Sequence, residues 1–265
     1  MTWISAELSF SGQHPFALVV LFVSGFLASS INAVAGGGSL VTFPLFVALG
    51  VPALSANATT AVALWPGSLA SAFGYRDQMA AAKRHFRQLV PPTILGSLLG
   101  AWLLTHTPAR LFNFVVPILI LLATSLLAFQ TQIRSKVLGA KTRLSPPMGI
   151  LLQFVLSVYG GYFGAGMGII MLALFGLFVE GTLHEHNALK NGLAVTVNIA
   201  ASLFFLSSGL LWIIPGLCCM LGAITGGYVS ARLATRVDPV KLRRVIVALG
   251  CVMTAWFIWQ AWKSA

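Results

Sequence analysis

Two clusters of glycine interrupt long uncharged apolar stretches of the sequence, and polar residues lie beside the first of them. The first lies in the stretch 15–50 and comprises Asn32, Gly36, Gly37, Gly38 and Ser39. The second lies in the stretch 147–179 and includes Gly164, Gly166 and Gly168. A break between two half-helices exposes backbone N–H groups, and helix N-termini bind anions. Small residues also let membrane helices pack closely, but two breaks in matching places favour a binding site.

A second set of polar residues follows each glycine cluster. The first half of the sequence has Asn57, Thr59 and Thr60 there, and the second half has Asn187, Lys190 and Asn191. Residues 187, 190 and 191 are spaced i, i+3 and i+4 and so share one helix face. A lysine inside a membrane span costs about 2.5–3.5 kcal/mol and therefore usually faces a cavity or a partner. The alternative is that Lys190 lies near the helix start and extends to the membrane surface.

The charges near these residues indicate an anionic substrate. The sequence has only five acidic residues and none is central in an apolar span, so the charge near the candidate site is positive. Four titratable residues form a candidate proton relay between the second apolar stretch and the next span: Glu180, His184, Glu185 and His186. A solvated loop is the alternative. A metal site is also conceivable, but the two histidines are two residues apart and do not share a helix face, so we expect none. No cofactor is expected.

Composition places the whole chain in a membrane. Of its 265 residues 58% are hydrophobic and 8% are charged, whereas a soluble domain has about 25% charged residues. The net charge of +11 comes from basic residues in three short loops, 76–87, 131–146 and 232–244. Short basic loops mark the cytoplasmic side of a membrane. The basic excess is therefore a topology signal, and a nucleic-acid partner is not expected.

The apolar segments predict an all-α polytopic protein made of two similar halves. The predicted order is a broken segment 15–50, spans 56–74, 88–105 and 110–130, a linker 131–146, a broken segment 147–179, and spans 187–207, 210–231 and 240–262. Ala35-Gly36-Gly37-Gly38 aligns with Ala165-Gly166-Met167-Gly168 at an offset of 130, as Asn57-Ala58 does with Asn187-Ala188. We therefore expect a first repeat over 1–130 and a second over 147–265, joined by a cytoplasmic linker.

The basic loops also predict how the halves are oriented. All three loops lie on one side only if each broken segment enters and returns on the same side of the membrane. A re-entrant-type hairpin or a pair of short crossings would satisfy this condition. Each half then crosses an odd number of times, so the two repeats are inverted.

The glycine motifs resemble those of one known family. The sequence resembles the TauE/SafE family of bacterial sulfite and organosulfur anion exporters, also called TSUP or DUF81 permeases. The resemblance lies in the run 31–39 with Pro44 and Asn57-Ala58-Thr59, and in the runs 160–168 and 187–191. The resemblance implies a multi-pass protein of the bacterial inner membrane. It also implies that the glycine breaks and the faces around Asn57 and 187–191 form the functional core, without naming the anion.

These observations predict a carrier that exports a small anion by alternating access at the interface of the two repeats. Its expected partners are the anion and the lipid bilayer, and it could form homo-oligomers. An anion channel, a polytopic membrane enzyme and a structural subunit of a larger complex are the alternatives. No cluster of Asp, Glu and His has catalytic spacing within or beside the spans, so we do not expect an enzyme.

Overall fold

The computed structural model describes residues 15–34, 37–73, 76–138, 144–233 and 239–263, and these residues form helices without any strand. The helices are α2 (Pro15–Val34), α3 (Ser39–Ala48), α4 (Ala53–Phe73), α5 (Arg76–His106), α6 (Ala109–Ala128), α7 (Gln130–Leu138), α8 (Pro146–Tyr162), α9 (Met167–Phe178), α10 (Leu183–Leu206), α11 (Ile213–Leu233) and α12 (Pro239–Lys263). The predicted all-α architecture is therefore confirmed.

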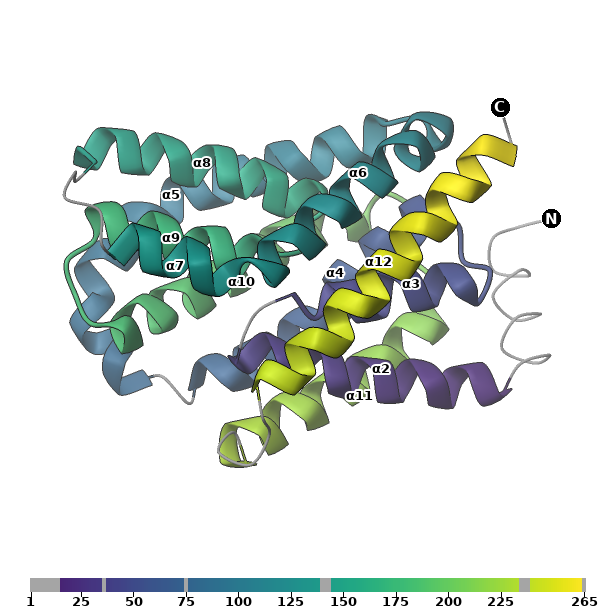
Figure 1. The fold of residues 1–265 in the computed structure, drawn as a ribbon, viewed down its shortest axis with the longest axis horizontal. Coiled ribbons are helices and arrows are strands. Elements are labelled where there is room, and N and C mark those ends of the chain that lie inside the picture. Colours follow the sequence, from purple (N-terminus) through teal and green to yellow (C-terminus); the bar gives the residue numbers. More distant parts are fainter. Residues whose placement is uncertain (1–14, 35–36, 74–75, 139–143, 234–238, 264–265) are drawn as a thin grey trace.

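Each broken segment folds into two helices that turn back on each other. The first gives α2 and α3, and the second gives α8 and α9 (Figure 1). The turns depend on glycine, because Gly37, Gly164 and Gly166 have φ angles of 93°, 74° and 75°, which other residues adopt only at a cost. Gly38 is needed for space, since a Cβ there would lie 2.1 Å from the Ala28 carbonyl oxygen.

Two elements differ from the sequence prediction. Helix α5 begins at Arg76 instead of about residue 88, because its first turns carry the exposed Lys83, Arg84 and Arg87 and hydropathy alone assigns them to a loop. The predicted linker 131–146 contains most of the helix α7. Parts of two predicted cytoplasmic loops, 139–143 and 234–238, lie outside the described residues.

The helices of the two halves pack against each other in a reciprocal pattern. Helix α2 lies along α11, and α8 lies along α5; α4 packs on α11, and α10 packs on α5. Glycines permit these close approaches, since a Cβ on Gly25 would lie 2.0 Å from the Cys219 oxygen and one on Gly100 would lie 2.1 Å from the Val158 oxygen. Helices α4 and α10 also contact each other, as do α6 and α12. The interior of the helical bundle is therefore formed by helices of both halves.

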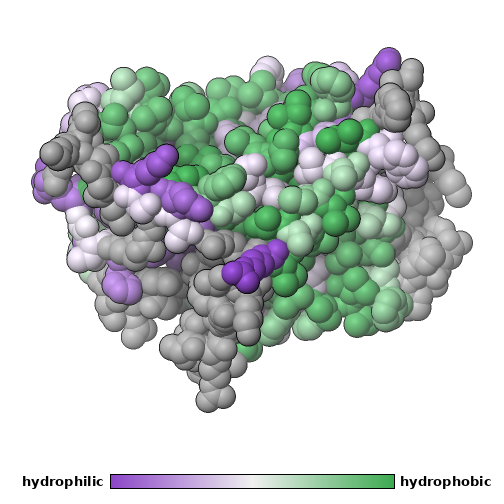
Figure 2. All heavy atoms as spheres, in the orientation of Figure 1, coloured by the Kyte–Doolittle hydropathy of each residue, from purple (hydrophilic) through white to green (hydrophobic). Residues whose placement is uncertain are grey.

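The outer surface of the helical bundle is apolar. Large exposed apolar side chains lie mainly on α2, α5, α6, α8, α11 and α12, with Phe16 and Phe114 among the most exposed. Figure 2 shows this apolar surface across much of the molecule, with hydrophilic residues at its left end, below its centre and at its upper right corner. Helices α5, α6 and α10 contain segments long and apolar enough to cross a membrane, at 79–106, 109–128 and 184–206. The surface is that of a multi-pass membrane protein.

The helix ends that flank the three basic loops lie in the same half of the molecule. In Figure 1 the ends of α4, α7 and α11 and the starts of α5, α8 and α12 are in the left half of the molecule. The starts of α2, α6 and α11 and the end of α12 are in the right half. The placement of the basic loops on the cytoplasmic side of a membrane stays a prediction.

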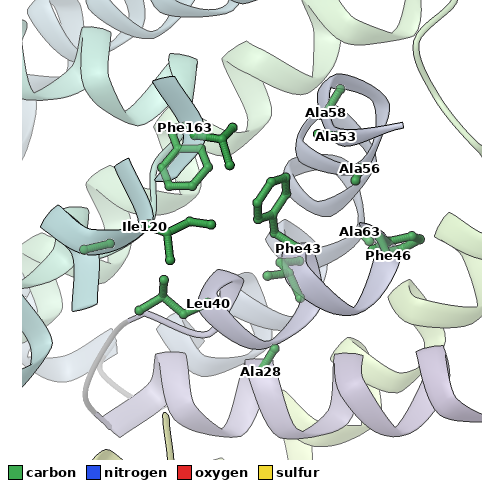
Figure 3. Close-up of a cluster of buried hydrophobic side chains, with 14 of the residues drawn as sticks. Ala28, Leu40, Phe43, Phe46, Ala53, Ala56, Ala58, Ala63, Ile120 and Phe163 are labelled. Carbon is green, nitrogen blue, oxygen red and sulfur yellow. The ribbon is translucent and has the colours of Figure 1, made fainter. Parts of the chain in front are cut away.

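Apolar side chains pack between the first glycine break and the second. Phe43 on α3 packs edge-to-face against Phe163 in the second break, with ring centroids 5.4 Å apart, and stacks on Phe257 of α12 at 6.0 Å. Figure 3 shows Phe43 and Phe163 facing each other, with Leu40 and Ile120 close by. The two breaks therefore meet at the centre of the bundle.

Candidate functional site

A cavity of about 80 Å³ lies where the two breaks meet α4 and α10. Both halves of the chain contribute to its wall. Its lining residues are Asn32, Gly37, Ser39, Asn57, Thr60, Ala61, Leu64, Ser68, Gly160, Phe163, Gly164, Met167, Gly168, Lys190, Asn191, Ala194 and Asn198. Nine of them were candidates from the sequence: Asn32, Gly37, Ser39, Asn57, Thr60, Gly164, Gly168, Lys190 and Asn191.

Among the described residues of the cavity wall, Lys190 is the only charged one. It lies seven residues into α10, about 10 Å from the helix start, and is only 2% exposed. Its aliphatic chain lies against Gly168, where an added Cβ would be 3.2 Å from the Lys190 Cδ. The side chain is thus held at the start of α9, inside the bundle, instead of extending to the membrane surface.

Three polar groups in the cavity wall have no protein partner. The Nζ of Lys190, the Oγ1 of Thr60 and the Nδ2 of Asn191 are buried without a hydrogen-bond partner among the described residues. Leaving a buried donor unpaired costs about 1–3 kcal/mol, and more for a charged group. Buried polar groups in native proteins are normally paired. Three unpaired donors on one small cavity are therefore typical of a site that binds a polar ligand.

The asparagines at the breaks hold the cavity wall in place. The Oδ1 of Asn32 accepts a hydrogen bond of 2.7 Å from the Gly38 N–H, across the first break. The Nδ2 of Asn57 donates a bond of 2.8 Å to the Tyr162 carbonyl, at the second break. Each asparagine therefore lines the cavity and also satisfies a backbone group that the interrupted helices leave unpaired.

Four other candidates lie outside the cavity wall, and Gly36 lies outside the described residues. Gly38 packs on Ala28 in the first hairpin. The Oγ1 of Thr59 faces the other way and accepts a 3.0 Å bond from the Trp212 N–H. Gly166 caps α9, and a Cβ on it would lie 3.3 Å from the Ala123 Cα. Asn187 is half-buried one turn before Asn191 and makes an interaction of its own.

Sequence reasoning missed the continuation of the polar faces along α4 and α10. Ser68 and Asn198 line the cavity, as do Leu64 and Ala194. They follow Thr60 and Lys190 at steps of four residues, the spacing of one helix face. The offset of 130 that relates the glycine clusters also relates Thr60 to Lys190, Leu64 to Ala194 and Ser68 to Asn198. That offset was the signal that could have found them.

The candidate relay residues are divided between different environments. Glu185 and Thr182 form a capping box at the start of α10: the Thr182 N–H donates to the Glu185 Oε2 at 3.0 Å, and the Glu185 N–H donates to the Thr182 Oγ1 at 3.3 Å. His184 is exposed. His186 is buried, and with Glu180 it lines a second cavity of about 210 Å³ at the corner between α9 and α10.

Comparison with known proteins identifies the family. The model of the family described as sulfite exporter TauE/SafE matches residues 21–257. The chain belongs to the TauE/SafE family. It is similar to a probable membrane transporter protein of Haemophilus influenzae, with 30% identity over 92% of this chain and 96% of that protein. The probable membrane transporter protein YfcA of Escherichia coli is 25% identical over 93% and 91%. No solved structure matches the chain.

A probable membrane transporter protein from a Sinorhizobium species, ORF9, is 28% identical over 82% of this TauE/SafE chain and 83% of its own length. The family match encloses both glycine breaks and every residue of the cavity wall. No acidic side chain is among the described residues that line the cavity. The described residues of this TauE/SafE protein contain no group of three or more metal-ligating side chains that could hold an ion. The described part of the cavity wall therefore presents unpaired hydrogen-bond donors and one ammonium group.

Proposed function

We propose that this TauE/SafE protein is a carrier that exports a small anion, with sulfite or a related organosulfur anion as substrate. The observation that carries the proposal is the buried ammonium group of Lys190, which shares a small cavity with the unpaired donors of Thr60 and Asn191. An isolated buried charge is costly. An anion in this cavity would pair the charge and satisfy the donors together.

The size of the cavity limits the substrate to a small molecule. A water-sized group needs about 10–15 Å³ of such a cavity, so about 80 Å³ holds roughly five to eight of them. A sulfur or other oxyanion has about this number of heavy atoms, whereas a nucleotide or a large lipid headgroup has many more. Sulfite is preferred because the family is described as a sulfite exporter; the curated relatives are named only as probable membrane transporters.

The mechanism that we propose is alternating access between two inverted repeats. The reciprocal packing of α2 on α11 and α8 on α5, and the constant offset between residues that line the cavity, support a two-fold relation between the halves. The ends that flank the basic loops would face the cytoplasm of a bacterial inner membrane. One half would rock against the other around a fixed site. An inside-negative potential favours export by about 2.3 kcal/mol per charge per 100 mV.

Flux measurements in proteoliposomes test this proposal. Purified protein would be reconstituted, loaded with labelled sulfite, sulfoacetate, thiosulfate or sulfate in turn, and compared with protein-free liposomes under an imposed potential. We expect saturable efflux of at least one sulfur anion that is faster when the loaded side is negative. Counterflow driven by unlabelled anion distinguishes a carrier from a channel. The absence of anion flux from well-folded protein would contradict the proposal.

A further inference from the structure

Lys190 supplies the full charge in the described wall of the cavity between the glycine breaks. Besides α10, that wall comes from the breaks and from α2, α3, α4, α8 and α9, and the sequences of these five helices contain no Asp, Glu, His, Lys or Arg. Two tyrosines of α8, Tyr159 and Tyr162, are neutral at ordinary pH. Helix α5 packs on α10, and the other titratable residues of these two helices are not among the described residues of the wall. They are Arg76, Asp77, Lys83, Arg84, His85, Arg87 and His106 on α5, and His184, Glu185 and His186 on α10.

The helix ends at the breaks add little net charge to that of Lys190. A helix start carries roughly half a positive charge, and a helix end carries roughly half a negative one. Helix α2 ends and α3 starts at the first break, and α8 ends and α9 starts at the second, so the partial charges of each pair oppose each other. Backbone donors are also in use there: the Gly38 N–H donates to the Asn32 Oδ1, and the Met167 N–H donates to the Gly164 carbonyl oxygen.

A single ammonium group favours a ligand with a single negative charge. Thr60, Lys190 and Asn191 are all buried, so a ligand that contacts them leaves most of its water behind. A singly charged anion beside Lys190 makes the site neutral, whereas a doubly charged anion leaves one negative charge without a partner. An unpaired charge in a buried site is costly. The charge of the wall therefore favours the singly charged form of an oxyanion.

Asn57 offers such a ligand a hydrogen-bond acceptor. Its Nδ2 donates to the Tyr162 carbonyl oxygen, and because that oxygen only accepts, the orientation of the amide is fixed. The Oδ1 is then the amide atom that Asn57, a residue of the cavity wall, has left for a ligand. A hydroxyl group can donate to it. A fully deprotonated oxyanion has only acceptor atoms and gains nothing from Oδ1.

Donors are available for the remaining oxygens of the ligand. Besides the ammonium group, the Thr60 Oγ1 and the Asn191 Nδ2 lack a partner among the described residues. The Gly38 N–H only donates, so the Asn32 atom that receives it is Oδ1, and the Nδ2 of this wall residue is left for a ligand. The described wall thus combines several donors with one amide acceptor.

We propose that the cavity selects the singly charged, hydroxyl-bearing form of its oxyanion, which for sulfite is hydrogensulfite. The inference rests on the proposed anion site at Lys190. The ammonium group pairs with the charge, Thr60 and Asn191 donate to the oxygens, and the Asn57 Oδ1 accepts from the hydroxyl. The proton crosses as part of the substrate and returns to water when hydrogensulfite dissociates on the other side, so no side chain has to titrate during transport.

The pH dependence of sulfite affinity tests this inference, because sulfite and hydrogensulfite exchange a proton close to neutral pH. Efflux of labelled sulfite from proteoliposomes would be measured over a range of concentrations at several internal pH values. The external pH and the potential are held fixed, and protein-free liposomes are subtracted. At alkaline pH the hydrogensulfite concentration falls roughly tenfold per pH unit. We expect the KM for total sulfite to rise in the same proportion and the KM calculated for hydrogensulfite to stay constant.

Two competitors of fixed charge provide the controls. Methanesulfonate carries one charge and sulfate carries two over the whole pH range of the experiment. Each would be added inside the vesicles, and its inhibition of sulfite efflux would be measured at each pH. We expect methanesulfonate to inhibit with a constant that does not change with pH, and sulfate to inhibit much more weakly.

The outcomes separate this inference from the proposed function. Absence of sulfite flux from well-folded protein contradicts the anion carrier itself. Sulfite flux with a KM that is constant when calculated for the doubly charged ion overturns only the selection of hydrogensulfite, as does sulfate that competes as well as methanesulfonate. An inhibition constant of methanesulfonate that rises in parallel with the KM for total sulfite also overturns it, because a titrating group of the protein would then cause the pH dependence.

Discussion

Asn57 of the first half and Tyr162 of the second half are joined by a hydrogen bond of 2.8 Å from the Asn57 Nδ2 to the Tyr162 carbonyl oxygen. The two residues are 105 positions apart in the sequence. The bond fixes α4 to the end of α8, just before the second glycine break. It makes the shape of the cavity depend on both halves, as expected for a site between two repeats.

Replacement of Asn57 by alanine should therefore weaken both the fold and transport. The Tyr162 carbonyl would lose its partner, at a cost of about 1–3 kcal/mol. Thermal unfolding in detergent and sulfite flux would be measured side by side. Asn113→Ala provides the control, because Asn113 is an exposed asparagine on α6. Equal stability and flux in the two variants would show that the bond has no structural role.

Gly38 is expected to tolerate no side chain, for reasons of space alone. Its φ of −59° suits any residue, but a Cβ would lie 2.1 Å from the Ala28 carbonyl oxygen. Gly38→Ala should force α2 and α3 apart and lower the yield of folded protein in size-exclusion chromatography. Gly209→Ala is the control: its φ is 69° and nothing lies within 4 Å, so it costs only about 1–2 kcal/mol of backbone strain. A normal yield for Gly38→Ala would contradict the close packing of the first hairpin.

Glu185 can be tested as a helix cap or as a proton carrier with two substitutions. Glutamine also serves at this position of a capping box, so Glu185→Gln should keep wild-type stability and flux at every pH. Glu185→Ala removes half of the capping box and should lower stability by about 1 kcal/mol. Thermal unfolding and the pH profile of sulfite flux are the measurements. A flux that loses its pH dependence in Glu185→Gln would restore Glu185 as a relay residue.

Asn198 should contribute to substrate affinity although the sequence did not single it out. It lines the cavity on the same face of α10 as Lys190. Loss of one hydrogen bond, worth about 0.5–1.5 kcal/mol, predicts that Asn198→Ala raises the KM for sulfite roughly twofold to tenfold. Thr196→Ala is the neighbouring control, because the Thr196 hydroxyl donates within its own helix to Gly192. An unchanged KM in Asn198→Ala would remove this residue from the site.

Hydropathy and glycine placement predicted most of the fold, because a bilayer imposes long apolar helices and allows interruptions only inside the protein. The spans predicted at 56–74 and 110–130 are α4 and α6 within a few residues. The first turns of α5 were missed because Lys83 and Arg84 lie on a part of the helix that hydropathy does not recognise. A chain segment needs no apolar character to be helical outside the membrane core.

The sequence predicted those residues of the candidate site that carry a charge or lie at a glycine break. It missed residues of a type that is common in any membrane span. Lys190 stands out because a buried ammonium group is costly. Ser68 does not, since a serine in a span commonly bonds to its own helix, as the Ser68 hydroxyl does to the Leu64 carbonyl. Thr59 looked equivalent to Thr60, and only the three-dimensional arrangement shows that it bonds to the Trp212 N–H instead.

Sulfite flux through Lys190→Met tests whether Lys190 holds the transported anion. Methionine keeps the length and the apolar packing against Gly168 but removes the charge. Lys83→Met, which removes an exposed charge at the start of α5, is the matched control for the loss of one positive charge. We predict saturable, potential-sensitive sulfite efflux in wild type and Lys83→Met and its loss in folded Lys190→Met. Wild-type efflux in Lys190→Met would show that Lys190 does not hold the anion.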